Sequence, residues 1–138
     1  MAIIKLLESD RTSLATHLRS LWDSASGPCT LEFYTAPQPS GPAAAVTTQT
    51  KLGTLTCSDP LGSEASGVLT FGSISPDASA DADGTATWCR LKDGAGVARA
   101  DFDVTNTAGN GYVKLNTTVI VTGGPILVTS FLVTIGGG

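Results

Sequence analysis

The sequence offers few side chains whose type and spacing suggest catalysis. His17 is the only histidine. A hydrolytic triad needs such a base beside a nucleophile and an orienting group, and the chain has no G-x-S-x-G motif to supply them. We therefore expect His17 to be an exposed or partly packed structural residue. We expect no catalytic residues and no enzyme activity.

The stretch Ser79-Ala-Asp-Ala-Asp-Gly84, preceded by Asp77 and containing Asp81 and Asp83, is the closest match to a metal site. Oxygen-bearing side chains alternate in this stretch and Gly84 follows, as in a calcium-binding loop. The match then fails, because the position that should carry a bidentate Glu is Arg90 and the sequence after Gly84 is strand-like. We therefore expect loop acids that turn and solvate the chain, with no bound metal.

Three cysteines complete the candidates for chemistry. Cys29, Cys57 and Cys89 are far apart and form no C-x-x-C pair, whereas a zinc site needs clustered thiolates or imidazoles. Each lies beside apolar or β-forming residues, where a free Cys behaves as a small buried hydrophobe. We expect buried thiols and no cofactor; the alternative is an intermolecular disulfide in an assembled particle.

Composition narrows the class of protein further. The 138 residues suffice for one domain. The charged fraction is 14% and the formal net charge is -4, which argues against a nucleic-acid partner. No stretch approaches the roughly eighteen apolar residues of a membrane helix, so we expect no membrane association. Lys5 and Glu8 interrupt the region that a signal peptide keeps apolar, which predicts a chain that stays in the cytoplasm where it is made.

The N-terminal part of the chain predicts one amphipathic helix over residues 9–26. Ser9 or Asp10 would cap its start, and Gly27 followed by Pro would end it. Residues 1–8 are apolar enough to form an arm or an edge strand. The predicted buried stripe consists of Leu14, Leu18, Leu21, Trp22 and Ala25.

The remainder, residues 29–135, has the residue types and turn signals of β-structure. Residues 97–104 alternate cleanly, and the Asp-Gly turn before them predicts a hairpin. Residues 126–135 are apolar on both faces. We predict a mainly β fold, a single antiparallel β-sandwich (Ig-like or jelly-roll-like) with one N-terminal amphipathic helix and a flexible tail at 136–138. The predicted strands are 29–35, 52–57, 68–74, 85–91, 97–104, 113–121 and 126–135.

The positions of the two tryptophans separate a packed structural domain from a carbohydrate-binding module. Trp22 lies on the predicted helix stripe and Trp88 lies within a predicted strand, so we expect both to pack in the core. An adhesin or carbohydrate-binding module would instead expose Trp88 and Tyr112 as a solvated aromatic patch.

The order of several segments resembles a family of small structural proteins of tailed bacteriophage virions. The segments are Thr30-Leu-Glu-Phe-Tyr-Thr35, Asp81-Ala-Asp-Gly-Thr-Ala-Thr-Trp88, Leu115-Asn-Thr-Thr118 and Val128-Thr-Ser-Phe-Leu-Val-Thr-Ile135. The resemblance covers about residues 10–135. Cys29 and Cys89 depart from it, since an aromatic residue is expected at position 89. The resemblance includes no catalytic motif, so it assigns no site residues.

This resemblance implies a structural role in a virion, after synthesis in the cytoplasm of the bacterial host. The leading hypothesis is a capsid decoration or cement protein that forms a homo-oligomer and binds the major capsid protein or neighbouring virion proteins. A neck, collar or tail component is the alternative, and an adhesin or carbohydrate-binding module is a third. The low charge suits a subunit that covers much of its surface, and an apolar arm suits strand addition to a neighbour.

Overall fold

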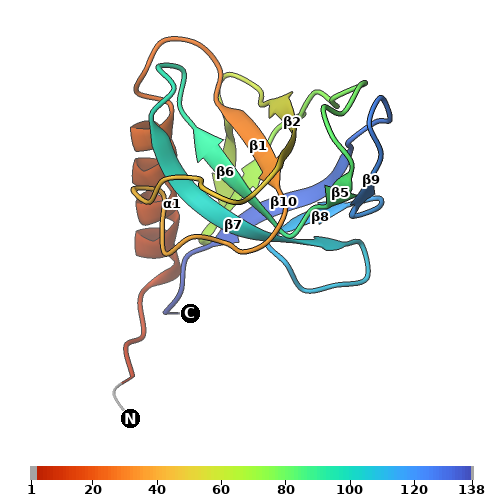
Figure 1. The fold of residues 1–138 in the computed structure, drawn as a ribbon. Coiled ribbons are helices and arrows are strands. Elements are labelled where there is room, and N and C mark those ends of the chain that lie inside the picture. Colours follow the sequence, from red (N-terminus) through yellow and green to blue (C-terminus); the bar gives the residue numbers. More distant parts are fainter. Residues whose placement is uncertain (1–2, 138) are drawn as a thin grey trace.

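Helix α1 stands beside a strongly curled β-sheet (Figure 1). The computed structural model describes residues 3–137, which form one helix and ten strands. The elements are α1 (Glu8–Trp22), β1 (Thr30–Tyr34), β2 (Lys51–Thr56), β3 (Gly62–Ala65), β4 (Val68–Phe71), β5 (Gly84–Thr85), β6 (Trp88–Lys92), β7 (Ala98–Asn106), β8 (Val113–Leu115), β9 (Val119–Ile120) and β10 (Val128–Thr134).

Eight of these strands form one sheet in the order β2-β1-β6-β7-β8-β10-β4-β3, and β5 pairs with β9 separately. Neighbouring strands run antiparallel except β7 and β8, which are parallel. The predicted mainly β, antiparallel-rich fold with one N-terminal helix is therefore confirmed. The sheet curves far enough to give a sandwich-like half-barrel (Figure 1).

An irregular segment after β4 covers the β2 edge of the sheet. The Ser75 amide donates to the Thr56 carbonyl oxygen (2.9 Å), and the Asp81 amide donates to Leu52 (2.7 Å). On its other side, Asp77 exchanges two backbone hydrogen bonds with Ile126, just before β10. The segment thus joins β2 to the start of β10 and satisfies an edge that would otherwise be open to other chains.

The inner face of the curled sheet holds the apolar core, and Trp22 extends from α1 into it. Its ring meets Phe102 edge-on at 6.1 Å and lies tilted against Phe71 at 6.4 Å. Phe71 in turn stacks on Phe131 at 3.7 Å. The expectation of a core Trp22 is confirmed. Fully buried core side chains include Cys29, Leu31, Phe33, Leu52, Leu55, Leu61, Leu69, Leu91, Val113, Leu115 and Ile126.

The helix differs from its prediction in both bounds and orientation. It begins at Glu8 with Leu7 as N-cap and without a side-chain cap, so the predicted caps Ser9 and Asp10 lie inside its first turn. It ends at Trp22, four residues early, where the Asp23 carboxylate accepts a hydrogen bond from the Leu61 amide (3.0 Å). A long-range contact therefore takes the place of the predicted Gly27 stop.

The predicted buried stripe is wrong at three of its five residues, since two leucines are exposed and Ala25 lies beyond the end of α1. Trp22 is buried and Leu18 is partly buried, but Leu14 and Leu21 are 49% and 45% exposed. The buried small residue Ala15 lies against the sheet instead. Because α1 packs on the sheet through Ala15 and Trp22, the leucines one position before each of them turn toward solvent.

Two strand assignments also differ. The predicted strand 113–121 is divided into β8 and β9, and 85–91 is divided into β5 and β6. Strand β3 was not predicted because its Gly-Ser-Glu-Ala sequence has low strand propensity. It forms because Ser66 (φ 51°) and Gly67 (φ 74°) supply the two left-handed positions of a tight hairpin turn to β4.

Residues 3–7 lead away from the barrel as an extended arm (Figure 1). The Leu6 amide donates to the Gly137 carbonyl oxygen at 2.6 Å, so the base of the arm lies beside the end of the chain. Residues 1, 2 and 138 of the predicted arm and tail lie outside the described part. Within residues 3–137, no helix combines the length and the apolar character needed to span a bilayer.

Replacing Trp22 should test how α1 is attached. Trp22→Ala removes the ring between Phe71 and Phe102 and should lower the free energy of unfolding by about 3–5 kcal/mol, measured by chemical denaturation. Ser13→Ala, at an exposed position of α1, is the matched control and should change it by less than about 0.5 kcal/mol. Equal effects of the two changes would contradict this attachment.

Candidate functional site

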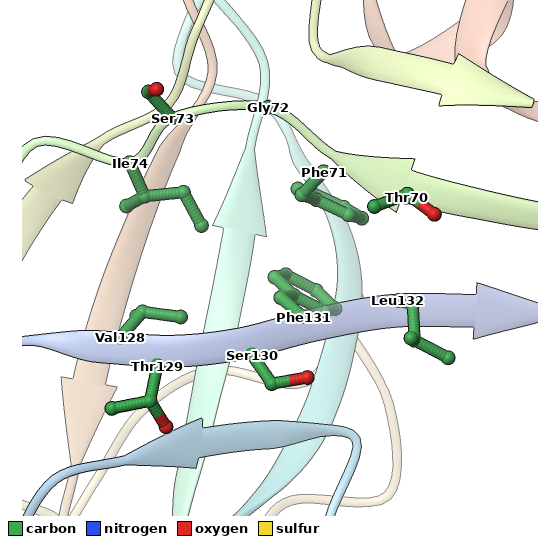
Figure 2. A pocket seen from close by; sticks show the side chains of 10 residues that line it. All are labelled: Thr70, Phe71, Gly72, Ser73, Ile74, Val128, Thr129, Ser130, Phe131 and Leu132. Carbon is green, nitrogen blue, oxygen red and sulfur yellow. The ribbon is translucent and has the colours of Figure 1, made fainter.

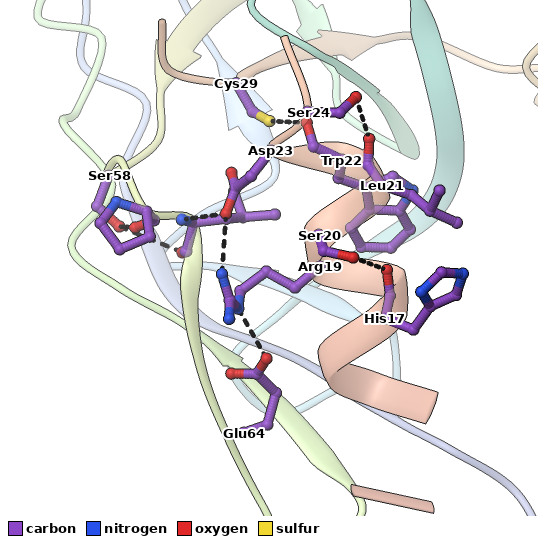
Figure 3. A network of polar contacts seen from close by, with 12 residues as sticks. His17, Arg19, Ser20, Leu21, Trp22, Asp23, Ser24, Cys29, Ser58 and Glu64 are labelled. Atoms are coloured by element: carbon purple, nitrogen blue, oxygen red, sulfur yellow. Dashed lines mark hydrogen bonds and ion pairs between the residues drawn. The ribbon is translucent and has the colours of Figure 1, made fainter. Parts of the chain in front are cut away.

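A polar network holds α1 against the β3–β4 hairpin. Arg19 Nε donates to Glu64 Oε1 at 2.7 Å, and Arg19 also contacts the Asp23 carboxylate at 3.4 Å. These hydrogen bonds raise the pKa of the guanidinium, so it stays charged. Figure 3 shows the His17 ring turned away from this network, and His17 is exposed. The expected structural position of His17 is thus observed.

The loop acids serve as anchors for neighbouring segments. Asp77 Oδ2 accepts a hydrogen bond from the Thr54 amide (3.1 Å). This bond joins the irregular segment after β4 to strand β2. Asp83 Oδ1 accepts both the amide (2.7 Å) and the hydroxyl (3.0 Å) of Thr122, which lowers the pKa of Asp83. Asp81 is held by its backbone. Among residues 3–137, no three His, Cys, Asp or Glu side chains gather as a metal-binding group.

The three cysteines are free and buried, as expected. Burial raises the pKa of Cys29 to about 11 and that of Cys57 to about 12, and it also raises that of Cys89. Cys29 Sγ donates to the Trp22 carbonyl oxygen (3.3 Å). Thiols with raised pKa in a packed core are poor nucleophiles, so these groups serve packing.

The outer face of β1, β6 and β7 carries a row of buried charges that the sequence analysis missed. Strand register places Glu32 opposite Arg90, and Arg90 opposite Asp101. Arg90 makes two hydrogen bonds to Asp101, at 2.8 and 3.0 Å. Glu32 accepts hydrogen bonds from Tyr34 and pairs with Lys92 at 2.9 Å. The only signal in the sequence was polar alternation in these strands, which does not reveal which charges meet.

Aromatic packing completes this outer cluster, and the loop 36–50 covers it. Trp88 stacks on Tyr34 at 4.6 Å, and the Arg90 guanidinium lies 5.3 Å from the Trp88 ring centre. Arg90 also donates to the Gly41 carbonyl oxygen in the loop, which crosses in front of the sheet in Figure 1. Trp88 is fully buried, as predicted, but on the outer face and apart from the main core.

The outer cluster is suited to holding the loop and unsuited to proton transfer at neutral pH. Burial alone would raise the pKa of Glu32, but hydrogen bonds from Lys92 and Tyr34 outweigh it and hold this pKa below its usual value. Burial raises the pKa of Tyr34. Glu32 therefore remains ionised and Tyr34 remains neutral, whereas a general acid or base works best with a pKa near the operating pH.

A small cleft of about 310 Å³ lies between the end of β4 and strand β10. Phe71 and Phe131, which stack directly on each other, form part of its wall (Figure 2). Ser73, Thr129 and Ser130 are among its lining residues, and the Thr129 hydroxyl already donates to the Lys114 carbonyl oxygen (3.1 Å). The residues that line this cleft carry no titratable side chain, so it can offer hydroxyl hydrogen bonds and apolar contact only.

A larger, more open groove of about 590 Å³ lies between α1 and β7. Leu18 and Trp22 form its helix side, and Phe102 forms its floor with Tyr112 beside it at 5.9 Å. Tyr112 is half exposed. Since Trp88 is buried, the pair of exposed aromatics that a carbohydrate-binding module would need is reduced to Tyr112 alone.

The most unusual surface feature is a set of exposed large apolar side chains at the N-terminal end. Ile3 and Ile4 are 71% and 69% exposed on the arm, and Leu7, Leu14 and Leu21 are exposed along α1. Scattered exposed apolar residues are ordinary, but two adjacent exposed isoleucines on an arm and leucines repeated along one helix leave apolar area that a partner protein can cover. We call Ile3, Ile4, Leu7, Leu14 and Leu21 the N-terminal apolar surface and treat it as the candidate functional site.

Comparison of the chain with protein-family models, with curated proteins and with solved structures finds no match. Function must therefore be inferred from the surfaces described above and from the resemblance of the sequence segments.

Replacing Glu32 should test the outer cluster. Glu32→Gln removes the charge that pairs with Lys92 and should lower the free energy of unfolding at pH 7 by about 1–3 kcal/mol. The lowered pKa of Glu32 means that its contribution is complete above the unfolded value of about 4.3 and disappears as pH falls through the folded value. The difference between wild type and Glu32→Gln should therefore shrink from pH 5 to pH 3, as measured by denaturation.

The exposed Glu8 supplies the control, because Glu8→Gln should change the free energy of unfolding at pH 7 by less than about 0.5 kcal/mol. A Glu32→Gln deficit that persists undiminished at pH 3 would show that Glu32 stabilises the fold through packing and not through its charge.

Proposed function

We propose that this chain is a structural protein of a tailed-phage virion, a capsid decoration or cement protein that binds the shell through protein–protein contacts. The observation that carries the proposal is the exposure of Ile3 and Ile4 on an arm outside the barrel. Two adjacent isoleucines at about 70% exposure are an unfavourable arrangement for a free monomer. They suit a chain whose arm is covered by a neighbouring protein in an assembly.

The geometry of the arm supports docking of this kind. The Leu6 amide is bonded to Gly137, and the carbonyl oxygen of Leu6 accepts a hydrogen bond from Arg11 Nε (3.4 Å). The arm is thus fixed at its base, while Ile3 and Ile4 extend beyond it. Such an arm can add a strand to a neighbour or insert apolar anchors into a pocket. We assign the major capsid protein or an adjoining virion protein as the partner.

A neck, collar or tail position is the alternative within the same setting, because an arm of this kind suits a ring as well as a shell. Copy number separates the two. A ring position gives on the order of ten copies per particle, whereas a shell position gives on the order of hundreds. Mass measurement or cryo-microscopy of purified virions provides the count, and absence of the chain from virions would overturn the proposal.

The arm itself is tested by the double change Ile3→Ser and Ile4→Ser. Each buried isoleucine contributes about 1.5–3 kcal/mol, and about 1.4 kcal/mol corresponds to a tenfold change in affinity. Binding to shells that lack this chain should therefore weaken at least about tenfold, as measured by co-sedimentation. The chain should remain folded, because both side chains lie outside the core.

A matched double change is available at the far end of the molecule. Val119 and Val121 are 63% and 61% exposed near β9, so Val119→Ser with Val121→Ser removes a similar exposed apolar area. These changes should leave shell binding unaltered. Equal loss in both double variants, or no loss in the arm variant, would exclude the arm as the docking element.

A further inference from the structure

The outer face of α1 carries a leucine stripe, which we define as Leu7, Leu14 and Leu21. These residues are seven apart in sequence and are 68%, 49% and 45% exposed. Seven residues amount to two helical turns within about 20°, so Leu14 and Leu21 lie along one line of α1, and Leu7 is the N-cap residue at the start of the helix. Ala15 and Trp22, each one position later, face the sheet. The leucine stripe therefore takes no part in the packing of α1 on the sheet of its own chain.

We propose that α1 pairs antiparallel with α1 of a second copy of this chain, about a twofold axis that passes beside Leu14. In that arrangement Leu14 meets its own counterpart, and Leu7 meets Leu21 of the second copy. The pair of Leu7 and Leu21 then occurs at each end of the contact, once in each direction, as a twofold interface between identical chains requires. The proposal does not depend on the virion role, since it concerns the purified chain.

Charge complementarity favours the second copy and the antiparallel direction. Asp10 and His17 are both exposed and, by helical geometry, lie on the flank of the stripe away from Trp22. Antiparallel pairing places Asp10 of each copy beside His17 of the other, twice per dimer. An imidazole N–H donates to a carboxylate in either protonation state of the ring. A parallel pair would instead leave Asp10 of one copy two helical turns from His17 of the other, so this hydrogen bond could not form.

The other flank of the stripe carries Arg11 and Leu18. Arg11 is bonded to the Leu6 carbonyl oxygen of its own chain, and Leu18 continues into the groove formed by Trp22, Phe102 and Tyr112. Helix α1 is already held by its own barrel, so pairing incurs little of the ordering cost that a free helix would incur. With 15 residues, α1 is about 22 Å long, so the contact is small and the dimer should be weak and concentration-dependent.

Cysteine cross-linking tests the direction of pairing. Leu14→Cys should form a disulfide-linked dimer under mild oxidation. Leu7→Cys and Leu21→Cys should not cross-link alone but should do so when the two variants are mixed. The native thiols do not interfere, because all three are buried. Val97→Cys, an exposed position in the β6–β7 turn, is the control and should stay monomeric.

Sedimentation velocity supplies the second measurement. Leu14→Glu should place two carboxylates at the twofold axis and raise the dissociation constant at least about tenfold, whereas Ser13→Glu adds the same charge off the stripe and should change it little. A wild-type chain that stays monomeric at millimolar concentration overturns the proposal. So does self-cross-linking of Leu7→Cys and Leu21→Cys, which would indicate a parallel pair.

Discussion

The insertion of Trp22 between Phe71 and Phe102 is the contact on which the presentation of α1 depends. One aromatic side chain would allow the helix to rotate about its axis, but the ion pair between Arg19 and Glu64 fixes it at a second point. With both contacts in place, the rotation of α1 is determined. Leu14 and Leu21, which precede Ala15 and Trp22, must then face solvent, and they form the helical part of the N-terminal apolar surface.

The two faces of the sheet are stabilised in different ways. The inner face is apolar and is filled by side chains of the curled sheet itself. The outer face of β1, β6 and β7 carries Glu32, Arg90 and Asp101, each paired with an opposite charge. Removing one partner of a buried pair is costly because the other charge remains without compensation. The charges beneath the loop 36–50 are therefore compensated mainly by one another, and the loop adds a hydrogen bond to Arg90.

Much of the fold could be predicted from the sequence because it depends on local patterns. Alternation in residues 97–104 and the Asp-Gly turn located β7 and its hairpin correctly. The rotation of α1 could not be predicted, because Leu14 and Ala15 compete for the inner face and the small residue is selected only by close approach to the sheet. Strand β3 was missed for a related reason, since its pairing with β4 is imposed by a turn and not by its own composition.

The surface features divide in the same way into those set by local sequence and those set by tertiary contacts. The apolar character of residues 1–8 was evident in the sequence, whereas the row from Glu32 through Arg90 to Asp101 required the strand register. The hydrogen bond between Leu6 and Gly137 brings both ends of the chain to one side of the barrel. A peptide fused to either terminus would therefore emerge next to the arm and occupy the space around Ile3 and Ile4. The exposed turn after β9, which contains Gly123, is well separated from α1 in Figure 1, and an inserted epitope would extend from it into the medium.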